Sequence, residues 1–252
     1  MGANPFLGVF LHGAGGFAAG SFYLPFKGVR RWAWESMWII GGVFSWLVAP
    51  WVVAFIAVPE PLTALANAPA SSIFWAFFFG ILWGVGGLTF GLSMRYLGMS
   101  LGYAVALGFC AAFGTLIPPL FNGTFLQLLT TASGLVTFGG ILVCLAGIAV
   151  CGRAGMLKEN ELSDAEKQAA IQEFDFARGM WVALISGVMS ACMAFAIAAA
   201  KPIADQALEL GAPPLFQNSP AFIIIFAGGF LTNLVWCVFL NVRNKSGGNY
   251  LD

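Results

Sequence analysis

The sequence has very little charge for its length. Only 9% of its 252 residues are Asp, Glu, Lys or Arg, and 60% are hydrophobic, whereas a soluble domain has about 25% charged residues. A chain with so few polar residues cannot face water on all sides. The composition therefore predicts an all-α integral membrane protein in a lipid bilayer. The net charge of zero and the lack of a Lys/Arg stripe give no indication of nucleic acid binding.

Sequence motifs for catalysis and metal binding are also missing. The chain has no HExxH, no GxSxG and no Walker loop, and no pair of acidic residues lies inside an apolar stretch. One histidine cannot build a multi-histidine metal site. The five cysteines show no CxxC spacing and are predicted to be free thiols. We therefore expect neither an enzyme nor a cofactor or metal.

Long apolar stretches are what the sequence does have. A helix needs about 20 residues to cross a hydrocarbon core of ~30 Å. Seven stretches reach a spanning length, roughly 6–26, 37–58, 73–94, 97–121, 135–151, 179–200 and 220–240. The sequence thus predicts about seven transmembrane helices, which we number as spans one to seven.

The basic residues predict the orientation of these spans. Ten of the eleven Lys and Arg residues lie in alternate connections, beginning with the one after span one, and only Lys201 lies on the other side. Cytoplasmic loops carry an excess of basic residues. We therefore expect the N-terminus outside and the C-terminus in the cytoplasm.

Glycine spacing predicts a close helix contact and an internal repeat. Span three carries Gly80, Gly84, Gly87 and Gly91, which fall on one helical face and would let a neighbouring backbone approach. Two glycines separated by eight residues recur in spans one and six. The repeat unit is then five spans, an odd number, so a second copy would be inverted, as in many secondary transporters.

This repeat predicts a ten-helix (5+5) inverted-repeat bundle of which about seven helices are present. The predicted divisions are a first five-span repeat, 1–152; a polar cytoplasmic linker with a short surface helix, 153–178; and the first two spans of an incomplete second repeat, 179–252.

Two ionisable residues are candidates for proton coupling. His12 lies inside span one, and an ionisable group at membrane depth is a functional hypothesis by default. Histidine titrates near physiological pH; the alternative is a neutral histidine bonded to a neighbouring helix. Glu35 begins span two as a second protonation site or gate. Its alternative is a carboxylate at a helix N-terminus beside Arg31.

Amides and aromatic rings in or beside the spans suggest a sugar site. Amides bond hydroxyl groups, and aromatic faces pack against the C–H groups of a ring; interface anchoring and core packing explain the same residues equally well. The substrate candidates are Tyr23, Trp83, Tyr103, Asn122 and Asn233. Lys201 is a candidate for an outer gate or vestibule, or it pairs with Asp205, or its side chain reaches the membrane interface.

Five blocks, in order along the chain, carry a family resemblance. They are 23–29 with 32–38, 94–100, 114–116 with Pro119 and 122–123, 153–155 with 157–159, and 198–202. Through them the chain resembles the L-rhamnose–proton symporter family of the drug/metabolite transporter superfamily. His12 also falls where that family has a histidine.

The resemblance implies a carrier that imports L-rhamnose with a proton across the bacterial inner membrane. The last three family spans have no counterpart in the sequence, so we expect a chain truncated after span seven. The alternative functions are a seven-span receptor and an exporter of another small metabolite in the same superfamily. A retinal-linked receptor needs a lysine in a late span, and span seven has none.

Overall fold

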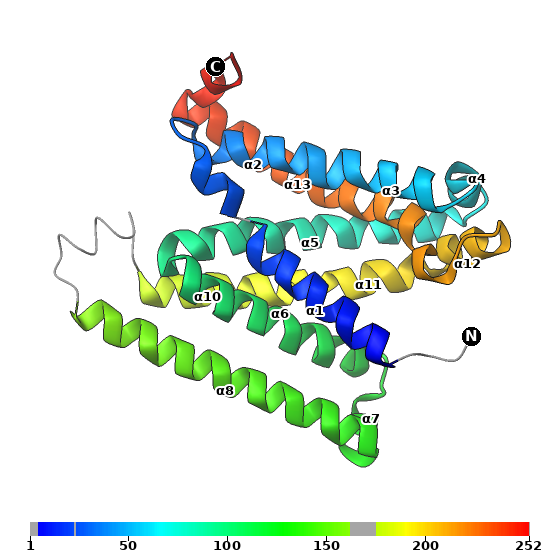
Figure 1. Cartoon of the computed structure of the whole chain (residues 1–252), viewed down its shortest axis with the longest axis horizontal. Coiled ribbons are helices and arrows are strands. Elements are labelled where there is room, and N and C mark those ends of the chain that lie inside the picture. The colour runs from blue at the N-terminus through cyan, green and yellow to red at the C-terminus, as the bar shows by residue number, and fades with distance from the viewer. Residues whose placement is uncertain (1–4, 23, 162–174, 252) are drawn as a thin grey trace. The chain divides into compact units, whose positions relative to one another are not determined.

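The computed structural model describes residues 5–22, 24–161 and 175–251, and these residues form helices and short connections without a strand (Figure 1). Seven helical segments among them are long and apolar enough to cross a membrane. They are Pro5–Phe26, Trp34–Ala57, Ala70–Leu97, Leu101–Leu120, Ala132–Ala154, Phe176–Ala199 and Pro214–Asn244. Each overlaps a predicted span, so the predictions of an all-α membrane protein and of about seven spans are confirmed.

Outside residues 162–174, the helices follow one another with short connections. In chain order they are α1 (Pro5–Ser21), η1 (Leu24–Gly28), α2 (Trp34–Gly42), η2 (Val43–Val48), α3 (Ala49–Ala57), α4 (Pro61–Ala66), α5 (Ala70–Leu97), α6 (Met99–Phe121), α7 (Phe125–Thr130), α8 (Ala132–Glu161), α10 (Phe176–Ser190), α11 (Cys192–Ala199), α12 (Lys201–Glu209), η3 (Pro214–Phe216), α13 (Ser219–Asn244) and η4 (Ser246–Leu251). Helix α8 continues ten residues beyond Cys151, where the apolar stretch ends. The surface helix predicted within the linker lies outside the described residues.

The chain divides into two compact units. The first unit is Met1–Ile40 with Cys237–Asp252, and the second is Gly41–Trp236. The first unit therefore contains α1, η1, the beginning of α2, the end of α13 and η4. The second unit contains the other helices, including most of α13.

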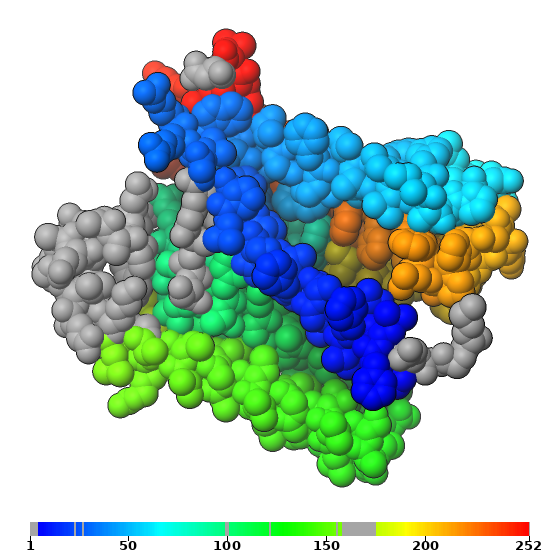
Figure 2. Space-filling view, viewed as in Figure 1, coloured from blue at the N-terminus to red at the C-terminus, as the bar shows by residue number. Residues whose placement is uncertain are grey.

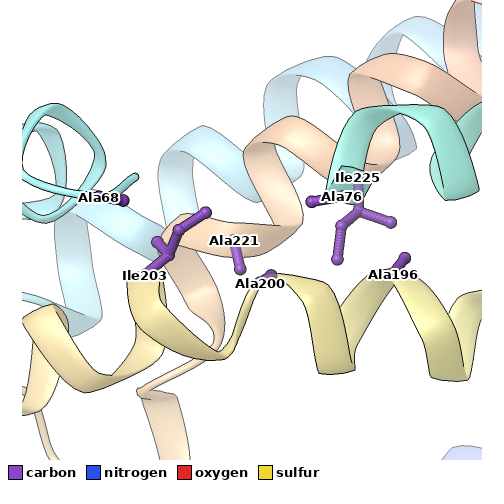
Figure 3. Close-up of a cluster of buried hydrophobic side chains, with 7 residues drawn as sticks. All are labelled: Ala68, Ala76, Ala196, Ala200, Ile203, Ala221 and Ile225. Atoms are coloured by element: carbon purple, nitrogen blue, oxygen red, sulfur yellow. The ribbon is translucent and has the colours of Figure 1, made fainter. Parts of the chain in front are cut away.

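In the second unit α5 is the central helix. It packs against α10, α11 and α6, and α6 packs in turn against α8. Figure 1 shows α10 and α11 following one another along α5. Small side chains allow this close packing: Ala76, Ala196, Ala200 and Ala221 are buried around Ile225 (Figure 3).

The glycine contact predicted for span three is formed with α13. A side chain at Gly80 would meet the backbone carbonyl of Ile225, and the Cβ of a residue at Gly84 would lie 2.7 Å from the carbonyl oxygen of Gly229. The prediction is wrong for Gly87, because no described atom lies within 4 Å of the place for its Cβ. Helix α10 instead approaches at Gly86. Gly86 is one residue before Gly87 and therefore lies about 100° away from it around the helix.

Short helices close one end of the second unit. Helices α4 and α12 lie side by side there, cyan and orange in Figure 2. Val58, Ala64, Ala207 and Ala212 are buried between them and their neighbouring loops. This layer is apolar, and it contrasts with the polar end of the first unit described next.

Candidate functional site

Glu35 is the one buried charged residue among those whose side chains the structure describes. It lies in the first turn of α2 and is only 3% exposed. A negative charge is stabilised near a helix N-terminus, where backbone N–H groups are unpaired. The sequence prediction that Glu35 begins span two is confirmed. Its burial requires further polar partners, because a buried charge without them is costly.

Those partners come from the other end of the sequence. Oε1 of Glu35 accepts a hydrogen bond from Nδ2 of Asn244 at 3.0 Å and lies 2.6 Å from the hydroxyl of Ser246. Asn244 ends α13, and Ser246 begins η4. Hydrogen bonds to an ionised carboxylate are about twice as strong as neutral ones. The start of span two is therefore tied to the end of span seven.

A second layer of hydrogen bonds extends this tie. The hydroxyl of Ser36 lies 3.1 Å from Oδ1 of Asn241 and 3.2 Å from Oδ1 of Asn249. Oδ1 of Asn249 also accepts the backbone N–H of Ala33 at 2.9 Å. Ser246 has Oδ1 of Asn241 as its other acceptor, at 2.8 Å. We call this set of residues the Glu35 clasp: Ala33, Glu35, Ser36, Asn241, Asn244, Ser246 and Asn249.

Aromatic rings pack around the clasp. Trp34 stacks on Trp38 one helical turn later, with centroids 5.2 Å apart, and Trp38 is 3% exposed. Trp32 meets Tyr250 edge to face at 6.1 Å, and Nδ2 of Asn241 donates to the hydroxyl of Tyr250 at 2.8 Å. These ring contacts therefore involve both α2 and η4, two of the helices that contribute residues to the clasp.

The other predicted proton site is in a different environment. His12 lies on α1, where the described residues around it are exposed and none is buried. No described hydrogen bond joins His12 to Glu35 or to the rest of the clasp. The predicted substrate residue Tyr23 lies outside the described residues.

The second unit brings two substrate candidates together. The half-buried ring of Trp83 stacks on Phe226 with centroids 5.2 Å apart and meets Trp46 edge to face at 6.1 Å. Its ring also covers Gly229. Asn233 is fully buried, and its Nδ2 donates to the carbonyl of the same Gly229 at 2.7 Å. Trp83 of α5 and Asn233 of α13 therefore both lie at the contact between these two helices, beside Gly229.

A π-helical stretch presents Trp46 to Trp83. The stretch is η2, and the N–H of Ala49 bonds the carbonyl of Phe44, five residues earlier. Pro50 explains this local geometry, because proline has no N–H for the carbonyl of Trp46 and its ring would clash with that carbonyl in a regular helix. Such single π turns often occur at functional sites.

The remaining candidates lie apart from this group. Tyr103 meets Phe90 edge to face at 5.1 Å in a separate core. Asn122 is exposed and caps the end of α6. Lys201 is exposed at the start of α12, and its Nζ lies 2.6 Å and 2.8 Å from the two carboxylate oxygens of Asp205. The predicted pairing of Lys201 with Asp205 is confirmed.

The comparison with known families decides the family. The family model for the L-rhamnose-proton symport protein matches residues 1–247. The chain belongs to this L-rhamnose-proton symporter family. It is similar to L-rhamnose-proton symporters of Cronobacter sakazakii (42% identity over 95% of this chain and 68% of that protein), Klebsiella pneumoniae subsp. pneumoniae (40%, 95% and 68%) and Citrobacter koseri (40%, 95% and 69%). No solved structure matches it.

Sequence reasoning missed most of the site of this symporter family member. The clasp residues on the span seven side were not predicted. One signal was present in the sequence: a long apolar run is followed within nine residues by Asn241, Asn244, Ser246 and Asn249. Across the described part of the chain, no group of three or more His, Cys, Asp or Glu residues could hold a metal ion. The site therefore offers a carboxylate, amides, hydroxyls and aromatic rings.

Proposed function

We propose that this chain is a secondary transporter that imports L-rhamnose together with a proton across the bacterial inner membrane. The observation that carries the proposal is the family match over residues 1–247, supported by relatives named L-rhamnose-proton symporter at about 40% identity. The basic residues support an N-terminus outside and a C-terminus in the cytoplasm. The Glu35 clasp then lies toward the cytoplasm, and Lys201 lies toward the outside.

Glu35 is our first candidate for the coupled proton. A buried carboxylate can bind and release a proton, and its charge in the clasp is balanced by hydrogen-bond donors that can exchange partners. One charge that moves through 100 mV provides about 2.3 kcal/mol, which can concentrate a neutral sugar about fiftyfold. His12 is the second candidate, because it is the only histidine and lies within span one.

Trp83 is our first candidate for contact with the sugar. L-rhamnose is a deoxyhexose, so it offers an apolar methyl group and C–H faces as well as hydroxyl groups. The half-buried ring of Trp83 suits the apolar parts, and Asn233 orients the adjoining backbone of α5 and α13. The further substrate candidates are Tyr23, Tyr103 and Asn122, and Lys201 with Asp205 is the candidate for an outer gate.

The function is tested by measuring external pH in a lightly buffered suspension of cells that express the chain and lack their own L-rhamnose uptake. Addition of L-rhamnose should cause a transient alkalinisation that a protonophore abolishes. Cells without the chain, and the stereochemically different deoxyhexose L-fucose, are the controls. Absence of both alkalinisation and uptake of labelled L-rhamnose in expressing cells would contradict the proposal.

The sugar contact is tested by Trp83→Ala. Loss of one aromatic face should raise the KM for L-rhamnose about tenfold, because such contacts are worth roughly 1 kcal/mol or more. Trp51→Ala is the matched control, since Trp51 is 41% exposed and stacks on Phe55 within its own helix. An unchanged KM in Trp83→Ala, with normal protein levels, would remove Trp83 from the site.

A further inference from the structure

The Glu35 clasp joins two spans from opposite ends of the sequence. Its hydrogen bonds to Glu35 connect residues more than 200 positions apart, and all the clasp residues lie within the first compact unit. A contact of this kind holds the start of α2 beside the end of α13. The two bonds to the carboxylate of Glu35 therefore connect these two helix ends directly.

The backbone on both sides of the clasp is strained. Within the described ranges, the non-glycine residues with positive φ are Arg31, at 72°, and Lys245, at 54°. Residues with a side chain rarely adopt this conformation, and it persists only where surrounding contacts hold it. The carbonyl of Arg31 accepts from Nδ2 of Asn249 at 3.4 Å, and Lys245 stands between Asn244 and Ser246. Opening the clasp would let both residues relax.

Ser246 can respond to the protonation state of Glu35. Its hydroxyl has one proton and two possible acceptors, Oε1 of Glu35 at 2.6 Å and Oδ1 of Asn241 at 2.8 Å. The charged carboxylate is the stronger acceptor. When Glu35 binds a proton, it loses that advantage, and the hydroxyl can turn to Asn241. The bond that crosses from span two to η4 is then lost.

We propose that Asn244 and Ser246 are positioning residues for proton coupling, and that protonation of Glu35 opens the clasp and separates the ends of α2 and α13. This proposal rests on the proposed function of the chain as a proton symporter. The clasp is then a cytoplasmic gate, held by a bond that is strongest while Glu35 is charged. Proton release to the cytoplasm then closes the gate again.

Several charged and titratable groups surround the clasp. Cys237 is fully buried on α13 and within electrostatic reach of Glu35. Tyr250 is joined to the clasp through Asn241. Among the side chains that the structure describes at this end, the exposed cations are Arg30, Arg31, Arg243 and Lys245. A neutral substitution at Ser246 leaves all these groups in place, so its effect on pH dependence reports the lost hydroxyl.

Cys237 provides a reporter of the open clasp. In a background with Cys110, Cys144, Cys151 and Cys192 replaced by alanine, the rate at which N-ethylmaleimide modifies Cys237 is measured in membranes at one fixed pH. We expect Ser246→Ala, which keeps the charge of Glu35 beside Cys237, to raise this rate at least about tenfold, the effect of losing one hydrogen bond to a charged group. Ser246→Thr keeps the hydroxyl and should restore the parent rate.

Ser21→Ala is the matched control, because the hydroxyl of Ser21 donates to the carbonyl of Phe17 in its own helix. Its rate should equal that of the parent. Equal rates for Ser246→Ala and the parent would overturn the proposal. The modification rate does not depend on sugar uptake. It therefore tests whether the clasp opens even if the chain does not carry L-rhamnose.

The pH profile of L-rhamnose uptake separates positioning from a structural role. Removal of the Ser246 hydroxyl makes protonation of the carboxylate easier, so the pH of half-maximal uptake should rise by about one unit in Ser246→Ala. Asn244→Leu should act in the same direction, and Asn244→Gln should act less. A lower uptake with an unchanged pH profile in Ser246→Ala, at equal protein levels, would show a merely structural contact and overturn the assignment.

Discussion

Helix α13 takes part in two contacts of opposite character. Along most of its length it packs on α5 through small residues, so the backbones approach closely at Gly80 and Gly84, with Asn233 donating across the contact to the carbonyl of Gly84. At its end it contributes amides to the Glu35 clasp, where a buried charge is held by hydrogen bonds. The first contact leaves no room for a larger residue at Gly80 or Gly84, because an added Cβ would meet the backbone of α13. The second contact has donors that can change acceptors, so it suits a switch.

The largest expected effect is on the packed contact. Gly80→Val would place a branched side chain against the carbonyl of Ile225, and overpacking of this kind costs about 3 kcal/mol. We expect a strong loss of folded protein in detergent, measured by size-exclusion chromatography after heating. Gly87→Val is the matched control, because the space beside Gly87 is open. Equal stability of the two variants would contradict the backbone contact.

Asn233→Ala is expected to have the next largest effect. The side chain is fully buried and donates to the carbonyls of Gly229, at 2.7 Å, and Gly84, at 3.3 Å. Loss of the amide leaves these carbonyls without that donor, which costs roughly 1–3 kcal/mol. The midpoint of thermal unfolding should therefore fall. If instead the stability were unchanged and only the KM for L-rhamnose rose, Asn233 would be a direct sugar ligand.

The smallest expected effect is at Lys201, which belongs to neither contact. Its ion pair with Asp205 is 72% exposed on the lysine side, and exposed pairs contribute about 0–1 kcal/mol. Lys201→Ala should therefore change the unfolding midpoint little. If its uptake rate nevertheless fell severalfold while that of Asp205→Ala did not, Lys201 would have a role at the outer gate beyond the pair.

The contrast between these two contacts also explains what the sequence could predict. Apolar run length is a local property, so all seven spans were found. Helix α8 shows the limit, because it continues to Glu161 after the apolar run ends. The contact at Gly80 and Gly84 was expected from spacing, but its partner α13 was not. Gly87 was assigned wrongly, because spacing does not show from which side a neighbour approaches.

The candidate site was predictable only in part. Glu35 stands out as an acidic residue at the start of an apolar run, and it was found. Its partners Asn244 and Ser246 are more than 200 residues away in the sequence, and no local pattern connects such residues. The alternative interpretation, a carboxylate at a helix N-terminus beside Arg31, describes only part of the arrangement. It leaves out Asn249, whose amide donates to the backbone carbonyl of Arg31.

The central claim is that Glu35 couples L-rhamnose movement to a proton. Its most direct test compares two measurements in the same membrane vesicles that contain Glu35→Gln: accumulation of labelled L-rhamnose driven by a proton gradient, and exchange of internal for external sugar without a gradient. Glu60→Gln, at an exposed carboxylate, is the control. We predict that Glu35→Gln exchanges sugar but accumulates none, so that a gradient of about fiftyfold per 100 mV falls to unity. Accumulation equal to that of the unmodified chain would contradict the claim.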